Sequence, residues 1–151
     1  SAAPEGSQRN VTLQVLIDAI VGKWQSARPE VSLELNVAPG ARQVVIESDQ
    51  GLHHALLNFL HNAADASPEH VSLEVGMEDS MALLAVEDRG AGIPPDISEA
   101  LGRRFVSRKD GGLGLGVMVR IPSLERLGGQ LPLLHREGGG TRWEIRLPLI
   151  L

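Results

Sequence analysis

The sequence predicts a two-layer α+β sandwich, in which helices cover one face of a mixed, mostly antiparallel sheet. Amphipathic helical stretches and strand-like runs follow one another along the chain, and several of those runs are joined by short turns. The 151 residues suffice for one substantial hydrophobic core and not comfortably for two. We therefore expect one domain over residues 11–151, preceded by a linker or disordered remnant over residues 1–10.

Two long helices are expected. Thr12 can cap a helix over residues 13–28, whose apolar residues recur at helical spacing. Asp49 can cap a second helix, which ends before Ser67 and Pro68 because proline cannot continue it. The expected core residues of the two helices are Leu13, Leu16, Ile17, Ile20, Trp24, Leu52, Leu56, Phe59, Leu60 and Ala63.

Six stretches have the alternation or composition of strands. They are 31–37, 44–47, 71–77, 81–86, 130–136 and 141–147, with residues 78–80 as a probable hairpin turn and Val31, Leu33, Leu35 and Val37 facing inward. Residues 88–116 are rich in glycine and proline, with a short helical piece expected near 97–101. Another short helix, over 124–127, is stopped by Gly128 and Gly129.

Composition excludes several functions. A net charge of −5 gives no basic field for nucleic acid. The chain has no cysteine, and its five histidines lack metal-ligand spacing. No apolar run is long enough to span a membrane, so we expect this segment to make no membrane contact. Because the chain begins Ser-Ala-Ala without Met, we expect it to be a segment of a longer protein.

The second helix carries a polar stripe as well as a core stripe. At about 100° per residue, Asn58, Asn62 and Asp65 lie on one face. Asn and Asp are mediocre helix formers, so this stripe needs an explanation. A solvated face is the plain alternative to a ligand-binding face.

A glycine turn directly follows the strand over 81–86. In Asp88-Arg89-Gly90-Ala91-Gly92-Ile93-Pro94, alternate glycines allow positive φ angles and close approach of a flat ligand. A carboxylate at the strand end can accept a hydrogen bond from an exocyclic amine, such as that of adenine. A tight turn without ligand is the alternative.

A second glycine segment is Gly111-Gly112-Leu113-Gly114-Leu115-Gly116, preceded by Arg108 and Lys109. If this loop opens a helix, its backbone N–H groups and the nearby cations form an anion site suited to polyphosphate. It is neither a Walker loop nor a dinucleotide fingerprint, and a surface loop is the alternative. In Gly139-Gly140-Thr141 the hydroxyl can bond a ligand or only the turn.

In this order and spacing, the stretches resemble the nucleotide-binding boxes of the GHKL superfamily, most closely the catalytic ATP-binding domain of sensor histidine kinases. The resemblance covers residues 11–148 and implies the Bergerat ATP-binding fold. Asn58 to Ala66 resembles the asparagine box, in which the residue at Asn62 coordinates Mg²⁺ on the ATP phosphates. The resemblance also implies that Asp88 binds adenine, that Thr141 supports Asp88 and that Phe105 belongs to the ATP lid. The full set of further residues with an implied role in cofactor binding is Asn58, Asp65, Asp88, Gly90, Gly92, Ile93, Phe105, Arg108, Lys109, Gly112, Leu113, Gly114, Leu115, Gly116 and Thr141.

Asn58 distinguishes among the relatives. ATP-hydrolysing members have a water-activating Glu at this position, whereas an amide has no usable basicity. Transfer to a protein acceptor is therefore favoured over hydrolysis, with Asn58 and Lys109 as the catalytic residues. Such transfer needs mainly positioning and charge neutralisation.

Two positions depart from the family pattern. Many kinases have Lys or Arg at the position of Asp65, where it meets a phosphate, so here we expect the cation to come from the lid. Asp65 and the glycine segments resemble redox-responsive kinases of the RegB or PrrB type. Pro122 interrupts what is usually a helix, and we expect a break there, with the helix restarting at Pro122.

The resemblance implies two partners: a phosphoacceptor and dimerisation domain, whose helix pair is absent from this chain, and a downstream response regulator. The expected location of this segment is cytoplasmic. The longer kinase that contains it can be anchored in a membrane. Two alternatives stay open. One is a serine kinase of the anti-sigma type, and the other is a degenerate GHKL interaction module with impaired ATP binding.

Overall fold

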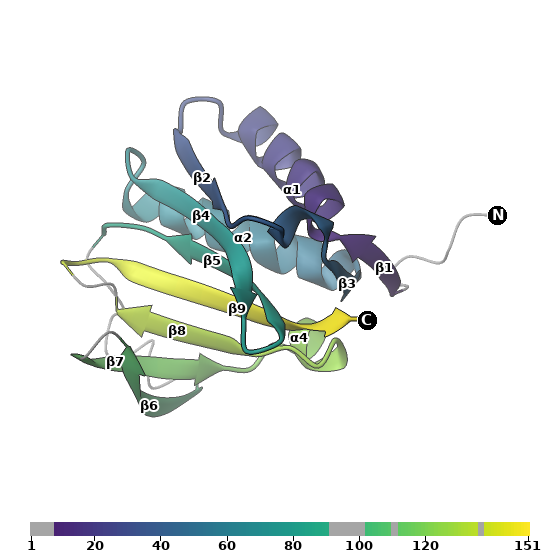
Figure 1. Cartoon of the computed structure of the whole chain (residues 1–151). Coiled ribbons are helices and arrows are strands. Elements are labelled where there is room, and N and C mark those ends of the chain that lie inside the picture. Colours follow the sequence, from purple (N-terminus) through teal and green to yellow (C-terminus); the bar gives the residue numbers. More distant parts are fainter. Residues whose placement is uncertain (1–7, 91–101, 110–111, 136–137) are drawn as a thin grey trace.

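The computed structural model describes residues 8–90, 102–109, 112–135 and 138–151. Figure 1 shows a curled sheet with helices α1 and α2 on one side, as expected for a two-layer sandwich. The elements are β1 (Arg9–Thr12), α1 (Leu13–Ala27), β2 (Leu33–Val37), a 3-10 turn (Ala41–Gln43), β3 (Val45–Ser48), α2 (Gln50–Ala66), β4 (Val71–Glu78), β5 (Met81–Glu87), β6 (Gly102–Lys109), β7 (Gly112–Val119), α4 (Pro122–Arg126), β8 (Leu131–His135) and β9 (Thr141–Ile150).

The sheet is mixed and mostly antiparallel. Its strand order is β2-β4-β5-β9-β8-β7-β6, and β3 joins it through β9 while also pairing with β1. Among these pairs only β2 and β4 run parallel. This parallel pair arises because the chain crosses over through β3 and α2 between the two strands. The predicted fold class is confirmed.

Both long helices begin at the predicted caps. Thr12 Oγ1 accepts from the Val15 N–H at 3.2 Å, and Asp49 Oδ1 accepts from the Leu52 N–H at 2.9 Å. Each contact satisfies one of the donors that a helix leaves unpaired in its first turn. The second helix ends at Ala66, directly before Ser67, as predicted.

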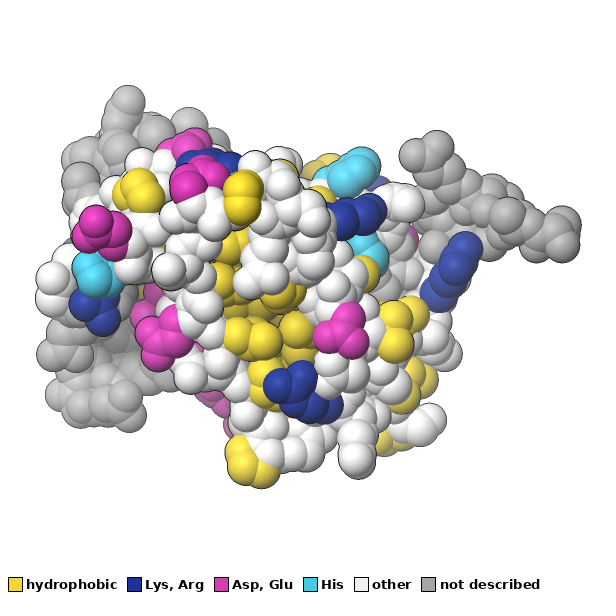
Figure 2. Space-filling view, turned by 90° about the horizontal axis from the view of Figure 1, so that it is seen from above, with side chains coloured by type: hydrophobic (Ala, Val, Ile, Leu, Met, Phe, Trp, Pro, Cys, Tyr) yellow, Lys and Arg dark blue, Asp and Glu magenta, His cyan; other side chains and the backbone are white. Residues whose placement is uncertain are grey.

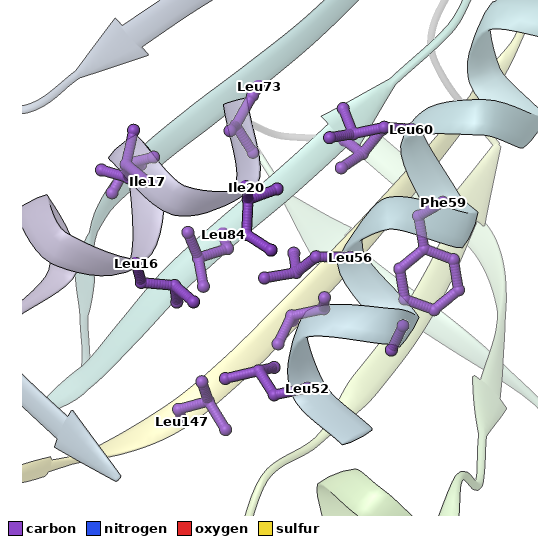
Figure 3. Close-up of a cluster of buried hydrophobic side chains, with 14 of the residues drawn as sticks. Leu16, Ile17, Ile20, Leu52, Leu56, Phe59, Leu60, Leu73, Leu84 and Leu147 are labelled. Atoms are coloured by element: carbon purple, nitrogen blue, oxygen red, sulfur yellow. The ribbon is translucent and has the colours of Figure 1, made fainter. Parts of the chain in front are cut away.

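The core lies between the helices and the sheet. The predicted core residues of both helices are all buried. Figure 3 shows Leu16 and Ile20 of α1 and Leu56 of α2 over side chains of the sheet, such as Leu84 and Leu147. Viewed from above, hydrophobic side chains are visible in a hollow, and acidic and basic side chains are interspersed around it (Figure 2).

Two details of the N-terminal half differ from the predictions. Strand β1 begins at Arg9, inside the segment expected to be a linker, and pairs antiparallel with β3. A strand of four residues that forms through a pairing with a distant segment cannot be predicted from its own sequence. Leu35 was expected to face inward but is 36% exposed. The reason is that β2 is an edge strand with β4 as its neighbour in the sheet.

The hairpin predicted around residues 78–80 is confirmed. Strands β4 and β5 pair antiparallel, and the two residues between them, Asp79 and Ser80, have φ angles of 52° and 64°. Two successive positive φ angles are the geometry of the tight turn whose twist matches a hairpin.

The second glycine segment forms a strand, so the expected glycine loop opening a helix is wrong. Residues 112–119 pair with β6 on one side, and Gly116–Val119 pair with β8 on the other. Leu113, Leu115, Val117 and Val119 alternate with period two, which is a strand pattern. Pro122 also disfavours helical backbone at the residue before it. As predicted, the helix that follows starts with Pro122 at its first turn.

Within the residues that the structure describes, no helix has the length and apolar character needed to cross a membrane. The helical piece expected near residues 97–101 lies outside the described residues.

Candidate nucleotide site

The sheet topology brings several of the predicted site segments to one end of the molecule. Because neighbouring strands alternate in direction, the end of β5 lies beside the start of β9 and the end of β8. One row across the sheet contains Glu87, Arg142, Leu134 and Gly116. Helix α2 also ends at this edge, since the chain goes from Ala66 directly to the start of β4 (Figure 1).

Asp88 follows β5 and is held firmly. Its N–H donates to the Thr141 carbonyl at 3.0 Å, and its own carbonyl accepts from the Thr141 N–H at 3.3 Å. The carboxylate Oδ1 accepts from the Gly90 N–H at 2.8 Å. Asp88 is 5% exposed and Thr141 is 7% exposed. A buried, fixed carboxylate at a strand end is a good acceptor for a ligand amine.

The Asp88 turn packs against the end of α2. A Cβ on Gly90 would lie 2.8 Å from the Cβ of Ala66, so only glycine fits there without movement. The Arg89 N–H donates to Ser67 Oγ at 2.9 Å, and Ser67 Oγ donates to the His70 carbonyl at 3.1 Å. These contacts join the Asp88 turn to the end of α2.

The role of Ser67 at this site was not predicted from the sequence. There Ser67 is only part of the stop signal at the end of the helix. A serine hydroxyl beside a helix end commonly bonds local backbone, and this was the available signal. Its bond to Arg89 spans 22 residues and becomes visible only in the folded chain.

Gly140 allows the start of β9 to approach Asp88. Its φ angle is 100°, and a Cβ there would lie 2.8 Å from the Cα of Arg89 and closer still to the Asp88 carbonyl. Any other residue would be strained by its backbone angle and would collide with this turn. Gly140 therefore shapes the site as well as the turn.

The polar stripe of α2 lies on the surface as predicted. Asn58, Asn62 and Asp65 are all exposed, while Phe59 and Leu60 face the core. Asp65 Oδ1 accepts from Arg28 Nη1 at 3.1 Å. The stripe thus ends in an ion pair with the first helix.

A ring contact positions α2 over the sheet. Phe59 stacks on Trp143 of β9, with ring centroids 4.4 Å apart and an interplanar angle of 16°. Phe59 neighbours Asn58 in sequence, and Trp143 is two residues from Thr141. The contact therefore fixes the position of α2 over β9, the strand whose first residue pairs with Asp88.

The remaining predicted residues lie on the β6–β7 hairpin or outside the described residues. Gly92 and Ile93 are outside. In the hairpin Phe105 is opposite Gly116, Arg108 is opposite Leu113, and Lys109 is opposite Gly112, while Gly114 and Leu115 are opposite Ser107 and Val106. The part of the hairpin formed by residues 106–109 and 112–115 therefore extends past the row that contains Glu87, at the same end of the sheet as Asp88.

A pocket of about 350 Å³ lies beside edge strand β2 and the start of β4. Asp88 is the one sequence-predicted residue that lines it. Its other lining residues include Glu34, Glu69, Glu74 and Glu87, with His70 and Arg89. This excess of carboxylates does not suit a polyphosphate, so we do not assign the nucleotide to this pocket.

The outer face of the sheet has a dense ion-pair network. Arg142 Nη1 lies 2.7 Å from both Glu74 and Glu87, and its Nε lies 2.7 Å from Glu144. Burial by itself lowers the pKa of Arg142, but the hydrogen bonds to Glu144, Glu74 and Glu87 raise it above its ordinary value. The network locks β4, β5 and β9 together directly beside Asp88 and Thr141.

Comparison with known proteins places the chain in a family. The model described as "Histidine kinase-, DNA gyrase B-, and HSP90-like ATPase" matches residues 47–151. The sensor protein kinase CarS of Pseudomonas aeruginosa is 35% identical over 125 residues, covering 80% of this chain and 27% of that protein. The sensor histidine kinase MtrB of Mycobacterium leprae is 30% identical over 156 residues, covering 97% of this chain and 27% of that protein.

Solved structures agree. The mycobacterial sensor histidine kinase MprB has a TM-score of 0.67 and 25% identity, covering 93% of this chain and 98% of that chain. The histidine kinase domain of the Escherichia coli osmosensor EnvZ has a TM-score of 0.67 and 23% identity, covering 100% and 93%. The ATP-binding domain of PrrB from Mycobacterium tuberculosis has a TM-score of 0.64 and 21% identity, covering 95% and 98%. The last two likenesses establish the fold.

This chain spans between 20% and 33% of the length of the first curated relatives that it matches. The chain belongs to the histidine kinase-, DNA gyrase B- and HSP90-like ATPase family, and it is homologous to the ATPase catalytic domain of sensor histidine kinases.

Proposed function

We propose that this chain is the ATP-binding catalytic domain of a two-component sensor histidine kinase. In this proposal it positions Mg-ATP for phosphoryl transfer to a histidine on a dimerisation domain outside this chain. One observation carries the proposal: the buried Asp88 carboxylate is fixed at the same end of the molecule as the exposed amide stripe of α2.

Asp88 is the proposed adenine acceptor. Its Oδ1 already accepts from Gly90, and a carboxylate has capacity for further donors, so it can also receive the exocyclic amine. Thr141 and Gly140 support it through the backbone pairing of β9 with the Asp88 turn. Gly90 and Gly92 are proposed to let the purine approach the backbone.

Asn62 is the proposed protein ligand of Mg²⁺. Magnesium bound to nucleotides takes few protein ligands, keeps several waters and shares the phosphate oxygens. An exposed amide oxygen on the α2 stripe fits this requirement, and the described residues hold no cluster of three His, Cys, Asp or Glu that would suit a metal cage. When bound, the ion supplies charge neutralisation on the phosphates.

The amide of Asn58 favours transfer over hydrolysis. It can orient a ligand group but cannot take a proton from water. Lys109 and Arg108 on the β6–β7 hairpin are proposed to meet the phosphates together with Phe105 and the segment Gly112 to Gly116, and Lys109 is the proposed catalytic cation. Asp65, at the end of the stripe and paired with Arg28, is a further proposed residue of the cofactor site.

The proposal includes partners and a compartment. A phosphoacceptor domain receives the phosphoryl group, and a response regulator takes it onward. ATP is the phosphoryl donor, so the domain works in the cytoplasm, where ATP is available. The known roles named for two relatives, the sensor protein kinase CarS and the sensor histidine kinase MtrB, support this assignment.

Calorimetric titration tests the proposal. The chain is titrated with ATP in the presence and absence of Mg²⁺, alongside Asp88→Asn and Asn62→Ala. We expect Asp88→Asn to weaken ATP binding strongly with or without Mg²⁺. We expect Asn62→Ala to lose only the increase in ATP affinity that Mg²⁺ causes. Unchanged ATP affinity in Asp88→Asn refutes the adenine assignment. Equal ATP affinity of the unsubstituted chain (the parent) with and without Mg²⁺ refutes the metal assignment.

Two activity assays separate the remaining alternatives. With a histidine-bearing dimerisation domain added, we expect phosphoryl transfer from labelled ATP to that domain. Phosphate release without an acceptor would instead indicate a hydrolase. A chain that binds no ATP at all would be a degenerate interaction module, and transfer to serine of a protein partner would indicate the anti-sigma type.

A further inference from the structure

Arg28 reaches from the first helix to the polar stripe of the second. It is the C-terminal cap of α1, because Pro29 disfavours helical backbone at the residue before it. Its Nη1 donates to Asp65 Oδ1 at 3.1 Å and its Nε donates to Glu30 Oε1 at 3.1 Å. Figure 1 shows α1 and α2 on the same side of the sheet.

The charge of Asp65 conflicts with the proposed role of its neighbours. Asp65 lies one helical turn beyond Asn62 on the same exposed face, where the metal-bound phosphates are proposed to lie. An isolated carboxylate there would repel a polyphosphate. The ion pair with Arg28 neutralises that carboxylate.

The guanidinium of Arg28 also has further N–H groups that can donate hydrogen bonds. Arginine has five N–H groups in a planar fork, and the bonds to Asp65 and Glu30 use two of them. The hydrogen bonds to Glu30 and Asp65 raise the pKa of Arg28, which keeps it charged. Its side chain is 25% exposed, so it is less mobile than a fully exposed arginine and retains access to a ligand.

Stability alone does not account for the pair. The Asp65 side chain is 71% exposed, and exposed ion pairs of this kind contribute little to folding. The pair spans 37 residues and joins the two helices at the end of the molecule that contains Asp88. A guanidinium held by Asp65, one helical turn after Asn62, can donate paired hydrogen bonds to phosphate oxygens.

We propose that Arg28 is a phosphate-binding residue of the nucleotide site, held beside the α2 stripe by Asp65. It supplies at least part of the cationic charge that the sequence predicts for the lid residues Arg108 and Lys109. This inference rests on the proposed ATP-binding function. It assigns Arg28 to the phosphates and not to the purine.

Titration with ATP and with adenosine tests the inference. Arg28→Gln removes the charge and keeps a polar side chain of similar shape, and we expect its ATP affinity to fall about tenfold. Its adenosine affinity is expected to match that of the parent. Arg42→Gln is the matched control, because Arg42 is an exposed arginine hydrogen-bonded to Gln14. We expect it to bind both ligands like the parent.

A double variant tests the placement of the charge. The double variant Arg28→Gln with Asp65→Lys has a cationic side chain at position 65 of the α2 stripe. We expect it to recover most of the ATP affinity that Arg28→Gln alone loses. Unchanged ATP affinity in Arg28→Gln overturns the inference, and so does a parallel loss for ATP and adenosine, which would indicate a structural role. A parent that binds no ATP overturns the proposed function itself, so the two failures are distinguishable in one experiment.

Discussion

Gly140 brings the first residue of β9 against the turn that holds Asp88. Its φ angle is 100°, and the space where a Cβ would stand is already taken by the backbone of Asp88 and Arg89. The position of the proposed adenine acceptor thus depends on the absence of a side chain on another strand.

The first prediction concerns this contact. Gly140→Ala should lower both ATP affinity and the free energy of unfolding, because it displaces the Asp88 turn. Gly139→Ala is a matched control, since Gly139 has a φ angle of 107° but a Cβ there meets nothing within 4 Å. Calorimetry measures the ATP affinity of both variants, and urea denaturation measures their free energy of unfolding. Backbone strain affects both variants, whereas the collision with the Asp88 turn affects only Gly140→Ala. Equal effects of the two would mean that the contact with Asp88 is unimportant.

The second prediction concerns the stacked rings. Phe59 is 5% exposed and lies on Trp143, so Phe59→Ala should destabilise the chain by about 3–5 kcal/mol. Leu57→Ala is the comparison, because Leu57 is only partly buried and should cost less. Urea denaturation followed by circular dichroism measures both. A similar loss in the two variants would contradict a special role for the stack.

The third prediction concerns the cap of α2. Asp49→Ala removes a buried acceptor from the Leu52 N–H and should cost about 1–2 kcal/mol. Asp49→Asn keeps an acceptor oxygen and loses mainly the ion pair with Arg126, whose side chain is 53% exposed. It should therefore stay close to the parent in thermal denaturation. If Asn is as harmful as Ala, charge and not capping is the main contribution.

The fourth prediction concerns the network beside the site. Arg142→Met removes one of the two guanidinium groups that pair with Glu144, a carboxylate that is 1% exposed, and should cost about 1.5–3 kcal/mol because Arg146 still lies 3.0 Å from it. Arg42→Met, at an exposed position, should change the free energy of unfolding by no more than about 0.5 kcal/mol. Chemical denaturation checks both. A tolerated Arg142→Met would show that the buried carboxylate does not need this partner.

The fifth prediction concerns pH. Burial, with Lys23 nearby, holds the pKa of His53 below its ordinary value of 6.5, although Asp49 acts in the opposite direction. Below pH 6.5 the unfolded chain therefore takes up this proton more readily than the folded chain, and stability falls as the pH decreases toward the folded pKa.

His53→Gln should accordingly reduce the loss of stability between pH 7.5 and pH 5.5 in urea denaturation. His54→Gln, at the neighbouring exposed position, should change the pH dependence much less, because the charge of His54 is only a minor cause of the lowered pKa of His53. A pH dependence that is the same in all three proteins would contradict the assignment to His53.

Local patterns predicted most of the elements because each depends on neighbours in sequence. The spacing of Leu52, Leu56 and Phe59 identified the buried face of α2, and the cap by Asp49 needed only three residues of context. The glycine segment was misinterpreted as a loop opening a helix. Whether residues 112–119 pair as a strand depends on β6 and β8, which lie elsewhere in the chain.

The sequence by itself determined that this protein has a helix with opposite apolar and amide faces, a carboxylate after a buried strand, and no disulfide or cysteine-based site. Those properties follow from residue type and short spacing. Only the tertiary structure decided that Ser67 holds Arg89, that Gly140 makes room for Asp88 and that Arg28 pairs with Asp65. Each of these contacts joins residues that are far apart in sequence, so only packing of the helices and the sheet brings them together.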